Sequence, residues 1–168
     1  KEAVNLIKDK IPLPSSIGRI CPHPCEKKCR RLFVDEPISI AGLKAFASDM
    51  DMASNDKYVP YVEPDTGKRV AIVGGGPGGL TAAYFLRRLG HSVNVFDMMP
   101  KMGGMLRYGI PEYRLPKKLL DSEISQIEAL GVNLKNNVKL GRDIELEELR
   151  HDFDAVVVAA GAWKSSSM

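Results

Sequence analysis

All three cysteines of the chain, Cys21, Cys25 and Cys29, lie in the short stretch CPHPCEKKC. Thiolates at such close spacing are typical ligands of zinc or of an iron–sulfur cluster, but each of these takes four protein ligands. Clustered cysteines also fit a reducing compartment better than scattered disulfides, so we expect a cytoplasmic protein. The stretch therefore supplies three ligands where four are needed.

Two prolines restrict the backbone around these cysteines. Pro22 and Pro24 prevent a helix from running through Cys21, whereas Pro24 suits the first position of a helix. We therefore predict that Cys25 and Cys29 lie in a short helix and that Cys21 lies in the loop before it. The positive end of the helix dipole would stabilise the Cys25 thiolate.

The surroundings of the cysteines leave alternatives open. A zinc site would need His23 as its fourth ligand, but C-x-H-x-C with two prolines is poor zinc-finger spacing. His23 equally suits a helix cap or an exposed position, and the cysteines could be uncoordinated. The basic residues nearby would offset the charge of a cluster, form a docking surface for a redox partner, or be a solvated face; they are Lys27, Lys28, Arg30 and Arg31.

A second chemical pattern is the glycine-rich loop GGGPGG at residues 74–79, between an apolar strand at 69–73 and a helix at 80–90. In the pattern GxGxxG, the first glycine permits a tight turn, the second lets the backbone approach a pyrophosphate, and the third lets helix and strand pack closely. The N-terminus of the helix then faces the phosphates. The loop therefore predicts a dinucleotide site.

Asp97 ends the next predicted strand, 18 residues after Gly79, where a carboxylate can accept hydrogen bonds from ribose hydroxyls. An acid at this place favours an unphosphorylated ribose, so FAD or NAD is expected and NADP is disfavoured. The loop alone does not separate FAD from NAD.

The elements that position these residues alternate between strand and helix from residue 68 onward. We predict strands at 69–73, 91–97, 132–135 and 154–162, and helices at 80–90, 116–131 and 144–153. Apolar strands separated by helices indicate a parallel sheet covered on both faces, so the expected class is an α/β, Rossmann-like domain.

The N-terminal part has a different pattern, with an amphipathic helix at the start, a loop at 11–18 and a helix after Pro37. We predict a mostly α-helical domain that carries the cysteines at 1–56, a linker at 57–67 and a dinucleotide-binding, Rossmann-like domain at 68–168. Since the chain lacks an initial Met and stops soon after an apolar strand, we expect a piece of a longer polypeptide.

The composition excludes several classes of protein. Apolar residues make up 44% and charged residues 27% of the chain, and the net charge of +3 is too small to indicate nucleic acid as a partner. No apolar run approaches the ~18 residues that a membrane span requires, and the first residues, KEAVNLIKDK, lack the apolar core of a signal peptide.

Five segments in order resemble the FAD-binding half of the glutamate synthase small subunit, and the N-terminal part of dihydropyrimidine dehydrogenase is similar. These are GGGPGGL, VFD, GGMLRYGIPEYRLPK, GVNLKNNVKLGRDI and DAVVVAAGA, while CPHPCEKKC and PISIAGLKAFA resemble the iron–sulfur domain of that family. The resemblance implies an NAD(P)H-dependent oxidoreductase, with a partial iron–sulfur domain at 1–56 and a truncated FAD-binding, Rossmann-like domain at 68–168. FAD would take a hydride from NADPH, held by a second domain absent here, and pass single electrons through clusters to a large catalytic or acceptor subunit.

The resemblance also implies a set of FAD-binding residues, which are Gly74, Gly75, Gly76, Pro77, Gly78, Gly79, Asp97, Gly104, Met105, Arg114, Leu140, Ala160 and Gly161. The glycine loop would hold the pyrophosphate, Asp97 the adenosine ribose, and the backbone of Leu140 the adenine. Arg114 would place a charge near the phosphates or the ring. The alternatives are that Arg114 is a solvated loop residue and that Leu140 only packs in the core.

For the metal sites the resemblance implies two [4Fe–4S] clusters, one served by Cys21 and Cys25 and the other by Cys29, with the remaining cysteines upstream. The family can also use a non-cysteine ligand in the helix after PISIAGL, and this sequence has Lys44 there, which does not normally ligate iron.

Two other functions fit the same motifs. One is a dehydrogenase whose Rossmann domain binds NAD directly, and the other is a non-catalytic electron-relay or dinucleotide-binding module. No residue is assigned a catalytic role, because flavin electron transfer needs no general base from the protein.

Overall fold

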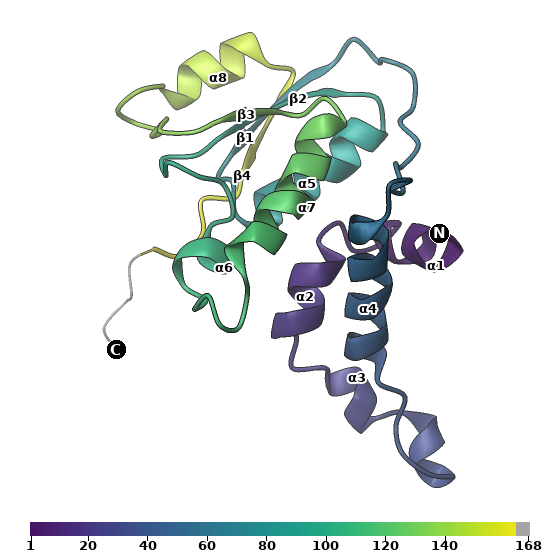
Figure 1. The fold of residues 1–168 in the computed structure, drawn as a ribbon. Coiled ribbons are helices and arrows are strands. Elements are labelled where there is room, and N and C mark those ends of the chain that lie inside the picture. The colour runs from purple at the N-terminus through teal and green to yellow at the C-terminus, as the bar shows by residue number, and fades with distance from the viewer. Residues whose placement is uncertain (164–168) are drawn as a thin grey trace. The chain divides into compact units, whose positions relative to one another are not determined.

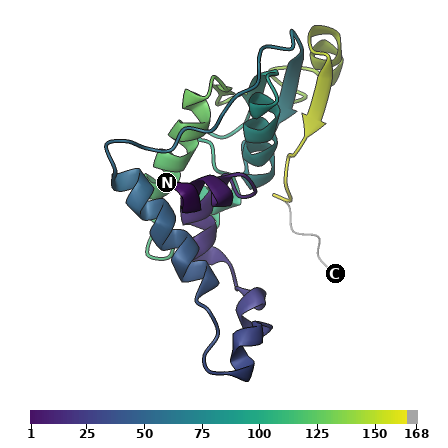
Figure 2. The ribbon, with the colours of Figure 1, turned by 90° about the vertical axis from the view of Figure 1, so that its right-hand side faces the viewer.

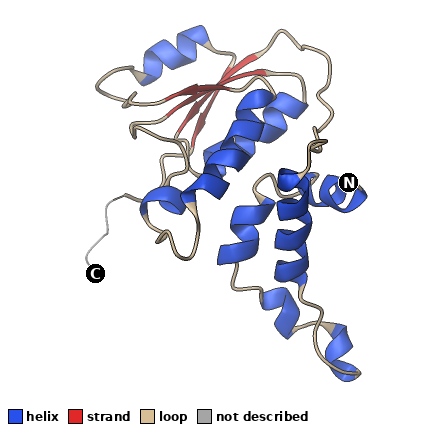
Figure 3. Cartoon of the chain, viewed as in Figure 1, coloured by secondary structure: helices blue, strands red, loops and turns tan. Residues whose placement is uncertain are grey.

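The computed structural model describes residues 1–163, which divide into two compact units (Figure 1). Unit 1 comprises Lys1–Pro60 and Pro111–Glu123, and unit 2 comprises Tyr61–Ile110 and the chain from Ile124 onward. All strands of the described chain belong to unit 2, and unit 1 is helical (Figure 3). These units differ from the predicted domains (1–56, 57–67 and 68–168) because residues 111–123 group with the N-terminal helices.

Four parallel strands form the sheet of unit 2: β1 (Arg69–Val73), β2 (Ser92–Phe96), β3 (Asn133–Lys135) and β4 (Ala155–Val158). Their order is β3-β2-β1-β4, with Val70 opposite Val93 on one side and Ala155 on the other. Strand β1 is buried from Val70 to Val73 since it lies in the middle of the sheet. The predicted parallel, Rossmann-like sheet is confirmed.

Helices α5 (Pro77–Arg88) and α8 (Leu146–Asp152) cover opposite faces of this sheet (Figure 1), and Figure 2 shows α5 beside the strands. Successive side chains of a strand point to opposite faces. Accordingly, Ile72 packs against α5 at Gly79, whereas its neighbour Val73 belongs to a core cluster with Leu149 of α8. Coverage of both faces is therefore confirmed.

The last predicted strand is wrong in extent and in burial. Strand β4 ends at Val158 rather than at residue 162, and Val158 is 63% exposed. The reason is that β4 pairs only with β1 in the described chain, so it is an edge strand. The residues after it leave the sheet and line a cavity at its carboxyl edge.

Unit 1 contains α1 (Glu2–Lys8), α2 (Pro14–Ile20), α3 (Pro24–Lys27), the 3₁₀ helix η1 (Arg30–Phe33) and α4 (Ile40–Ala53). Helix α7 (Lys117–Ala129) begins in unit 1 and ends in unit 2. Helices α2 and α4 pack closely because Gly18 has no side chain, and a Cβ atom there would lie 2.6 Å from the Cβ of Ala45. The predicted helix after Pro37 is confirmed as α4.

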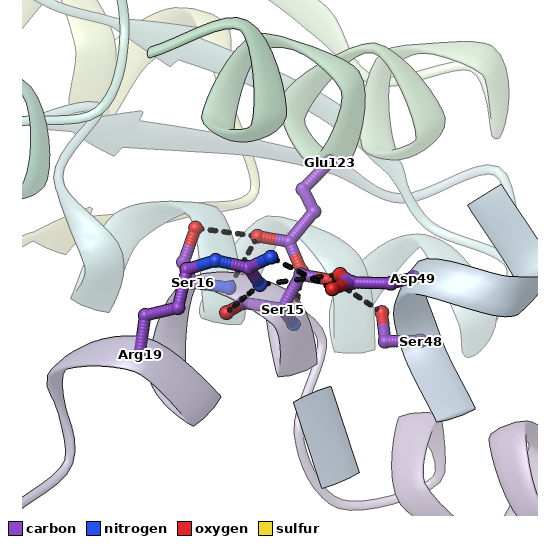
Figure 4. Close-up of polar contacts among 6 residues, drawn as sticks. All are labelled: Ser15, Ser16, Arg19, Ser48, Asp49 and Glu123. Atoms are coloured by element: carbon purple, nitrogen blue, oxygen red, sulfur yellow. Dashed lines mark hydrogen bonds and ion pairs between the residues drawn. The ribbon is translucent and has the colours of Figure 1, made fainter. Parts of the chain in front are cut away.

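The predicted loop at residues 11–18 is wrong, since Pro14–Ile20 form helix α2. Pro14 takes the first position, where its missing N–H costs nothing. The next backbone N–H groups, of Ser15 and Ser16, donate to the carboxylate of Glu123 at 2.7 Å and 3.0 Å (Figure 4). A cap supplied from so far along the chain leaves no local signal in the sequence.

Within the described residues, no helix combines the length and the apolar character that crossing a bilayer requires.

Candidate dinucleotide site

The glycine loop leaves the sheet at the carboxyl end of β1, between the ends of β2 and β4. The N–H of Gly74 donates to the carbonyl of Phe96 at 2.8 Å, and the N–H of Ala159 donates to the carbonyl of Val73 at 2.7 Å. Gly74 has φ +110°, and a Cβ atom there would lie 2.2 Å from the Ala159 carbonyl oxygen. Only glycine fits at this crossing of chains.

Packing inside the protein also requires glycine at Gly79 and leaves little room for a side chain at Gly75, where the flexible end of Met102 would have to move. A Cβ atom at Gly79 would lie 1.8 Å from the carbonyl oxygen of Gly74, and one at Gly75 would lie 2.0 Å from Sδ of Met102. Gly79 thus brings α5 close to β1, which is the role predicted for the third glycine of the pattern.

Gly76 and Gly78 have no such neighbours. A Cβ atom at Gly76 would meet nothing nearer than 3.8 Å, and one at Gly78 nothing nearer than 4.0 Å. Gly76 has ordinary extended dihedrals (φ −78°, ψ −175°), so neither its backbone nor its packing demands glycine. The open space above both residues instead fits a group that approaches the N-terminus of α5, where no side chain caps the helix.

This open space is a cavity of about 320 Å³ at the carboxyl edge of the sheet. Its lining comes from the ends of β1, β2 and β4 and from the loop before α6 (Met105–Tyr108), and consists of Gly74, Gly76, Pro77, Gly78, Asp97, Gly104, Met105, Ala159, Ala160, Gly161, Ala162 and Trp163. Ligands of open α/β sheets bind at this edge, where the strand order reverses beside β1.

A second cavity, of about 140 Å³, shares four lining residues with the first, namely Gly74, Asp97, Ala160 and Trp163. Its other walls are mostly apolar and consist of Val73, Phe96, Met98, Val138, Lys139 and Leu140. A cavity at the N-terminus of α5 and an adjoining cavity with mostly apolar walls together suit the two chemically different parts of an adenine dinucleotide.

Asp97 lies between the two cavities and holds the glycine loop in place. It follows β2 directly and is 8% exposed. Its Oδ2 accepts the N–H of Gly75 at 2.5 Å, and its Oδ1 accepts the N–H of Met99 at 2.7 Å. Each carboxylate oxygen retains a further lone pair, so the group can still accept ribose hydroxyls.

The loop at Gly103–Gly104 lies against the glycine loop. The N–H of Gly103 donates to the carbonyl of Gly75 at 2.7 Å. Gly104 has φ +50°, and a Cβ atom there would lie 2.7 Å from Cα of Gly76. This contact brings Met105, which is 52% exposed, to the cavity wall.

The structure thus brings together most of the residues that the sequence singled out, although their contacts with a cofactor stay predictions. Gly75 and Gly79 support the loop without lining either cavity. Leu140 lines the second cavity and also packs on the core of unit 2, so both of its interpretations fit. Arg114 lies in an exposed turn of unit 1, and its role stays a prediction.

Three further residues line the larger cavity and were not predicted from the sequence: Ala159, Ala162 and Trp163. The signal that could have identified these residues is their position, because they flank the Ala160–Gly161 pair that was predicted to approach the cofactor. Reading residues 159–162 as strand hid this, since the chain there turns over the cavity.

The cysteines lie at the ends of short helices in unit 1. Cys21 follows α2, Cys25 lies in α3, and Cys29 precedes η1; all three are free thiols. The placement of Cys29 inside a helix is wrong, because Lys28 leaves the helical conformation (φ −113°, ψ 15°) and α3 ends at Lys27. The predictions for Cys25 and for Pro24 at the start of the helix are confirmed.

Among residues 1–163, no three side chains of His, Cys, Asp or Glu are grouped so that they could hold a metal ion. The described residues therefore do not by themselves fit a cluster or a zinc ion. The imidazole Nδ1 of His23 lies 3.0 Å from Oε2 of Glu26, whose other oxygen accepts the N–H of Ala41 in α4. The assignment of the cysteines to two clusters stays a prediction.

Helix α2, which precedes Cys21, is held by a partly buried polar network within unit 1 (Figure 4). Ser15 Oγ lies 2.8 Å from Ser48 Oγ and 2.7 Å from Oδ1 of Asp49, and Arg19 makes two hydrogen bonds to the Asp49 carboxylate. Burial raises the pKa of Asp49, but hydrogen bonds from Arg19 and Ser15 outweigh it and hold the pKa below its usual value.

Two family models match the chain. Residues 1–56 match the model described as dihydropyrimidine dehydrogenase domain II, 4Fe-4S cluster, and residues 72–121 match the NAD(P)-binding Rossmann-like domain. The first covers the three cysteines, and the second covers the glycine loop and Asp97.

Curated relatives match nearly the whole chain. NADPH-Fe(3+) oxidoreductase subunit beta of Geobacter sulfurreducens is 44% identical over 99% of this chain and 25% of its own length. Glutamate synthase [NADPH] small chain of Mycobacterium tuberculosis is 40% identical over 96% and 33%. NAD-dependent dihydropyrimidine dehydrogenase subunit PreT of Salmonella typhimurium is 37% identical over 96% and 39%. The chain thus spans a quarter to about two fifths of these relatives.

Among solved structures, Mycobacterium tuberculosis FprA in complex with NADPH is similar, with a TM-score of 0.54 and 26% identity over 63% of this chain and 24% of that one. The predicted resemblance is confirmed by these matches: over nearly its whole length, the chain is homologous to one part of the glutamate synthase small chain and of dihydropyrimidine dehydrogenase subunit PreT.

Proposed function

We propose that the chain is the FAD-binding part, with an adjoining portion of the iron–sulfur domain, of an NAD(P)H-dependent oxidoreductase. In the whole protein, electrons from NAD(P)H would pass through FAD and clusters to a large catalytic or acceptor subunit. The subunit names of the relatives support such a complex, and the three free thiols support a cytoplasmic setting.

The observation that carries this proposal is the open space above Gly76 and Gly78 beside a buried Asp97. Glycine at these two positions costs backbone entropy and gains nothing in packing within the protein. A pyrophosphate at the N-terminus of α5 would occupy the space that the two glycines leave open, and Asp97 would then face the adjoining ribose.

In this proposal the chain binds and orients the cofactor rather than performing chemistry of its own. The glycine loop and α5 would hold the phosphates, Asp97 the ribose, and the Gly103–Gly104 loop would let the backbone pass close to the flavin side. FAD, when bound, supplies the acceptance of a hydride and the release of single electrons. The clusters enter no step here, because the described residues do not complete one.

A second candidate, direct binding of NAD by the same loop, is favoured by the match of residues 72–121 to an NAD(P)-binding family model. The two candidates share the pyrophosphate and ribose contacts and differ in the ring system, flavin or nicotinamide, that extends beyond the Gly103–Gly104 loop. Asp97 disfavours NADP in either case, since its carboxylate would face a 2′-phosphate.

The test is to titrate the purified 168-residue chain with FAD, NAD⁺ and NADP⁺ and to measure each dissociation constant calorimetrically. We expect FAD to bind tightest and NADP⁺ weakest, and Asp97→Ala to weaken FAD binding by roughly ten-fold or more. Folding of the variant is checked by circular dichroism. Tighter binding of NAD⁺ than of FAD would favour the second candidate, and no binding of any dinucleotide would refute both.

A further inference from the structure

Trp163 lies where the two cavities of unit 2 meet. It is one of four residues that line both, with Gly74, Asp97 and Ala160, and the only one of these four with a large side chain. The turn after β4 brings it there: Gly161 has φ +71°, and a Cβ atom on Gly161 would lie 3.9 Å from the indole nitrogen of Trp163. The indole thus forms a wall common to both cavities.

Tyr108, at the end of α6, supports this indole. Their ring centroids lie 5.8 Å apart, with the planes inclined by 56°. The Tyr108 hydroxyl accepts the N–H of Lys101 at 3.2 Å and donates to the Lys101 carbonyl at 3.1 Å. These bonds fix the hydroxyl end of the ring, and the backbone of α6 fixes the other end. Because the Tyr108 ring is restrained, its contact with the Trp163 indole fixes the position of that indole.

Three large apolar side chains nevertheless remain open to solvent at this place. Met105 is 52% exposed, Trp163 40% and Tyr108 38%, and all three lie in unit 2. Met105 and Trp163 line the larger cavity, and Tyr108 touches Trp163. Grouped apolar exposure beside a cavity is typical of surface that a ligand covers.

We propose that Trp163 is a cofactor-binding residue and that Tyr108 is its positioning residue. The indole contacts the dinucleotide where it passes from the glycine-loop cavity into the apolar cavity. This inference rests on the proposed function, because it needs a dinucleotide in both cavities. It adds an aromatic contact to a site that the motifs describe only by glycines and one acid.

Trp163 is the single tryptophan of the chain, which makes the first test direct. In isotope-labelled protein, the one indole N–H resonance is followed by NMR while FAD is added, and flavin binding is measured in parallel by its visible spectrum after ultrafiltration. We expect the indole resonance to shift in step with bound flavin. Flavin binding without a shift would overturn the inference and leave the proposed function standing; absence of flavin binding would overturn both.

Variants give a second measurement. We expect Trp163→Ala to weaken FAD binding by roughly ten-fold, since it removes a large apolar contact with the cofactor, and Trp163→Phe to weaken it by much less. Tyr61→Ala, which removes an aromatic ring that is 68% exposed and lines neither cavity, is the matched control and should leave FAD binding unchanged. Equal binding by Trp163→Ala and the control would overturn the inference.

The positioning role of Tyr108 is tested by combining variants. Tyr108→Ala should weaken FAD binding in the wild-type background but add little in the Trp163→Ala background, because residues that act as a unit are not additive. Tyr108→Phe, which keeps the ring and loses the hydroxyl contacts with Lys101, should move the indole resonance of the free protein. Fully additive losses in the double variant would overturn the role of Tyr108.

Discussion

A Cβ atom added at Gly79 would lie 1.8 Å from the Gly74 carbonyl oxygen, whereas one added at the neighbouring Gly78 meets nothing closer than 4.0 Å. Both glycines belong to the first turns of α5, so their helix propensities are alike. The difference separates glycine that the fold needs from glycine that a ligand needs. At the scale of single residues, a substitution at Gly79 therefore serves as the control for a substitution at Gly78.

This contrast leads to a prediction for two adjacent substitutions. Gly78→Ala should keep or slightly raise the melting temperature, because alanine is the better helix former, yet weaken FAD binding by roughly ten-fold or more by filling the cavity. Gly79→Ala should lower the free energy of unfolding by about 1–3 kcal/mol through overpacking against β1. Thermal unfolding and FAD calorimetry on both variants test this, and loss of stability in Gly78→Ala with intact binding would contradict it.

At the scale of elements, Glu123 decides whether residues 14–20 form a helix. Its carboxylate is 2% exposed and takes the N–H groups of Ser15 and Ser16 and the hydroxyl of Ser16. Burial raises the pKa of Glu123 above its ordinary value of 4.5, although these hydrogen bonds act in the opposite direction. Helix α2 therefore depends on a buried carboxylate whose ionised form is destabilised by the loss of solvation.

The raised pKa predicts how stability changes with pH. A group with a higher pKa in the folded state stabilises the fold fully below its unfolded pKa, and that contribution is lost as pH rises through the folded pKa. We therefore expect the free energy of unfolding of the wild type to fall relative to that of Glu123→Gln as pH rises above 4.5. Burial lowers the pKa of Lys8, so its contribution to stability changes with pH in the opposite sense; because the charge of Glu123 acts to raise that pKa, Glu123→Gln alters the Lys8 contribution as well.

Urea unfolding of both proteins at a series of pH values measures this difference. Glu36→Gln changes an exposed carboxyl of the same unit and should follow the wild type throughout. Parallel curves for the wild type and Glu123→Gln would show that Glu123 does not titrate differently on folding.

The sheet was predictable from the sequence because its signals are local. Apolar runs give β1 and β2, the glycine loop gives the turn into α5, and these elements place Asp97 at the same edge as the loop. Helix α2 was not predictable, since its cap comes from Glu123 in α7. The corresponding signal lies in α7 rather than near residues 14–20: Glu123 interrupts the apolar stripe of Leu120, Ile124 and Ile127, and an acid in such a stripe must find buried partners, but nothing there names α2 as the partner.

The site divides in the same way. The glycine loop and Asp97, which directly follow β1 and β2, were found from spacing, whereas Trp163 was missed because its place depends on the turn at Gly161 and on the ring of Tyr108. Neither contact has a periodic signature in the sequence. The three cysteines were predicted to be metal ligands from residue type alone, and that stays a prediction, because Cys21, Cys25 and Cys29 do not form a metal-binding group within the described residues.

At the scale of the whole molecule, the chain matches a quarter to about two fifths of relatives named as NADPH- or NAD-dependent enzymes. It contains one GxGxxG loop, and the two cavities beside that loop share walls and together suit one dinucleotide. If FAD occupies these two cavities, the nicotinamide of NAD(P)H must bind at a different site. The binding of flavin and the delivery of a hydride to it are then separable functions.

This separation predicts that the 168-residue chain, loaded with FAD, is not reduced by NADPH faster than free FAD is. Hydride transfer requires the reacting atoms to be held at roughly 3–3.5 Å, and an unbound nicotinamide lacks the large effective concentration that such positioning provides. Under anaerobic conditions, the flavin absorbance is followed after adding NADPH, and dithionite then serves as the control that the bound flavin can be reduced. Stoichiometric bleaching by NADPH would show that this chain itself holds the nicotinamide in place.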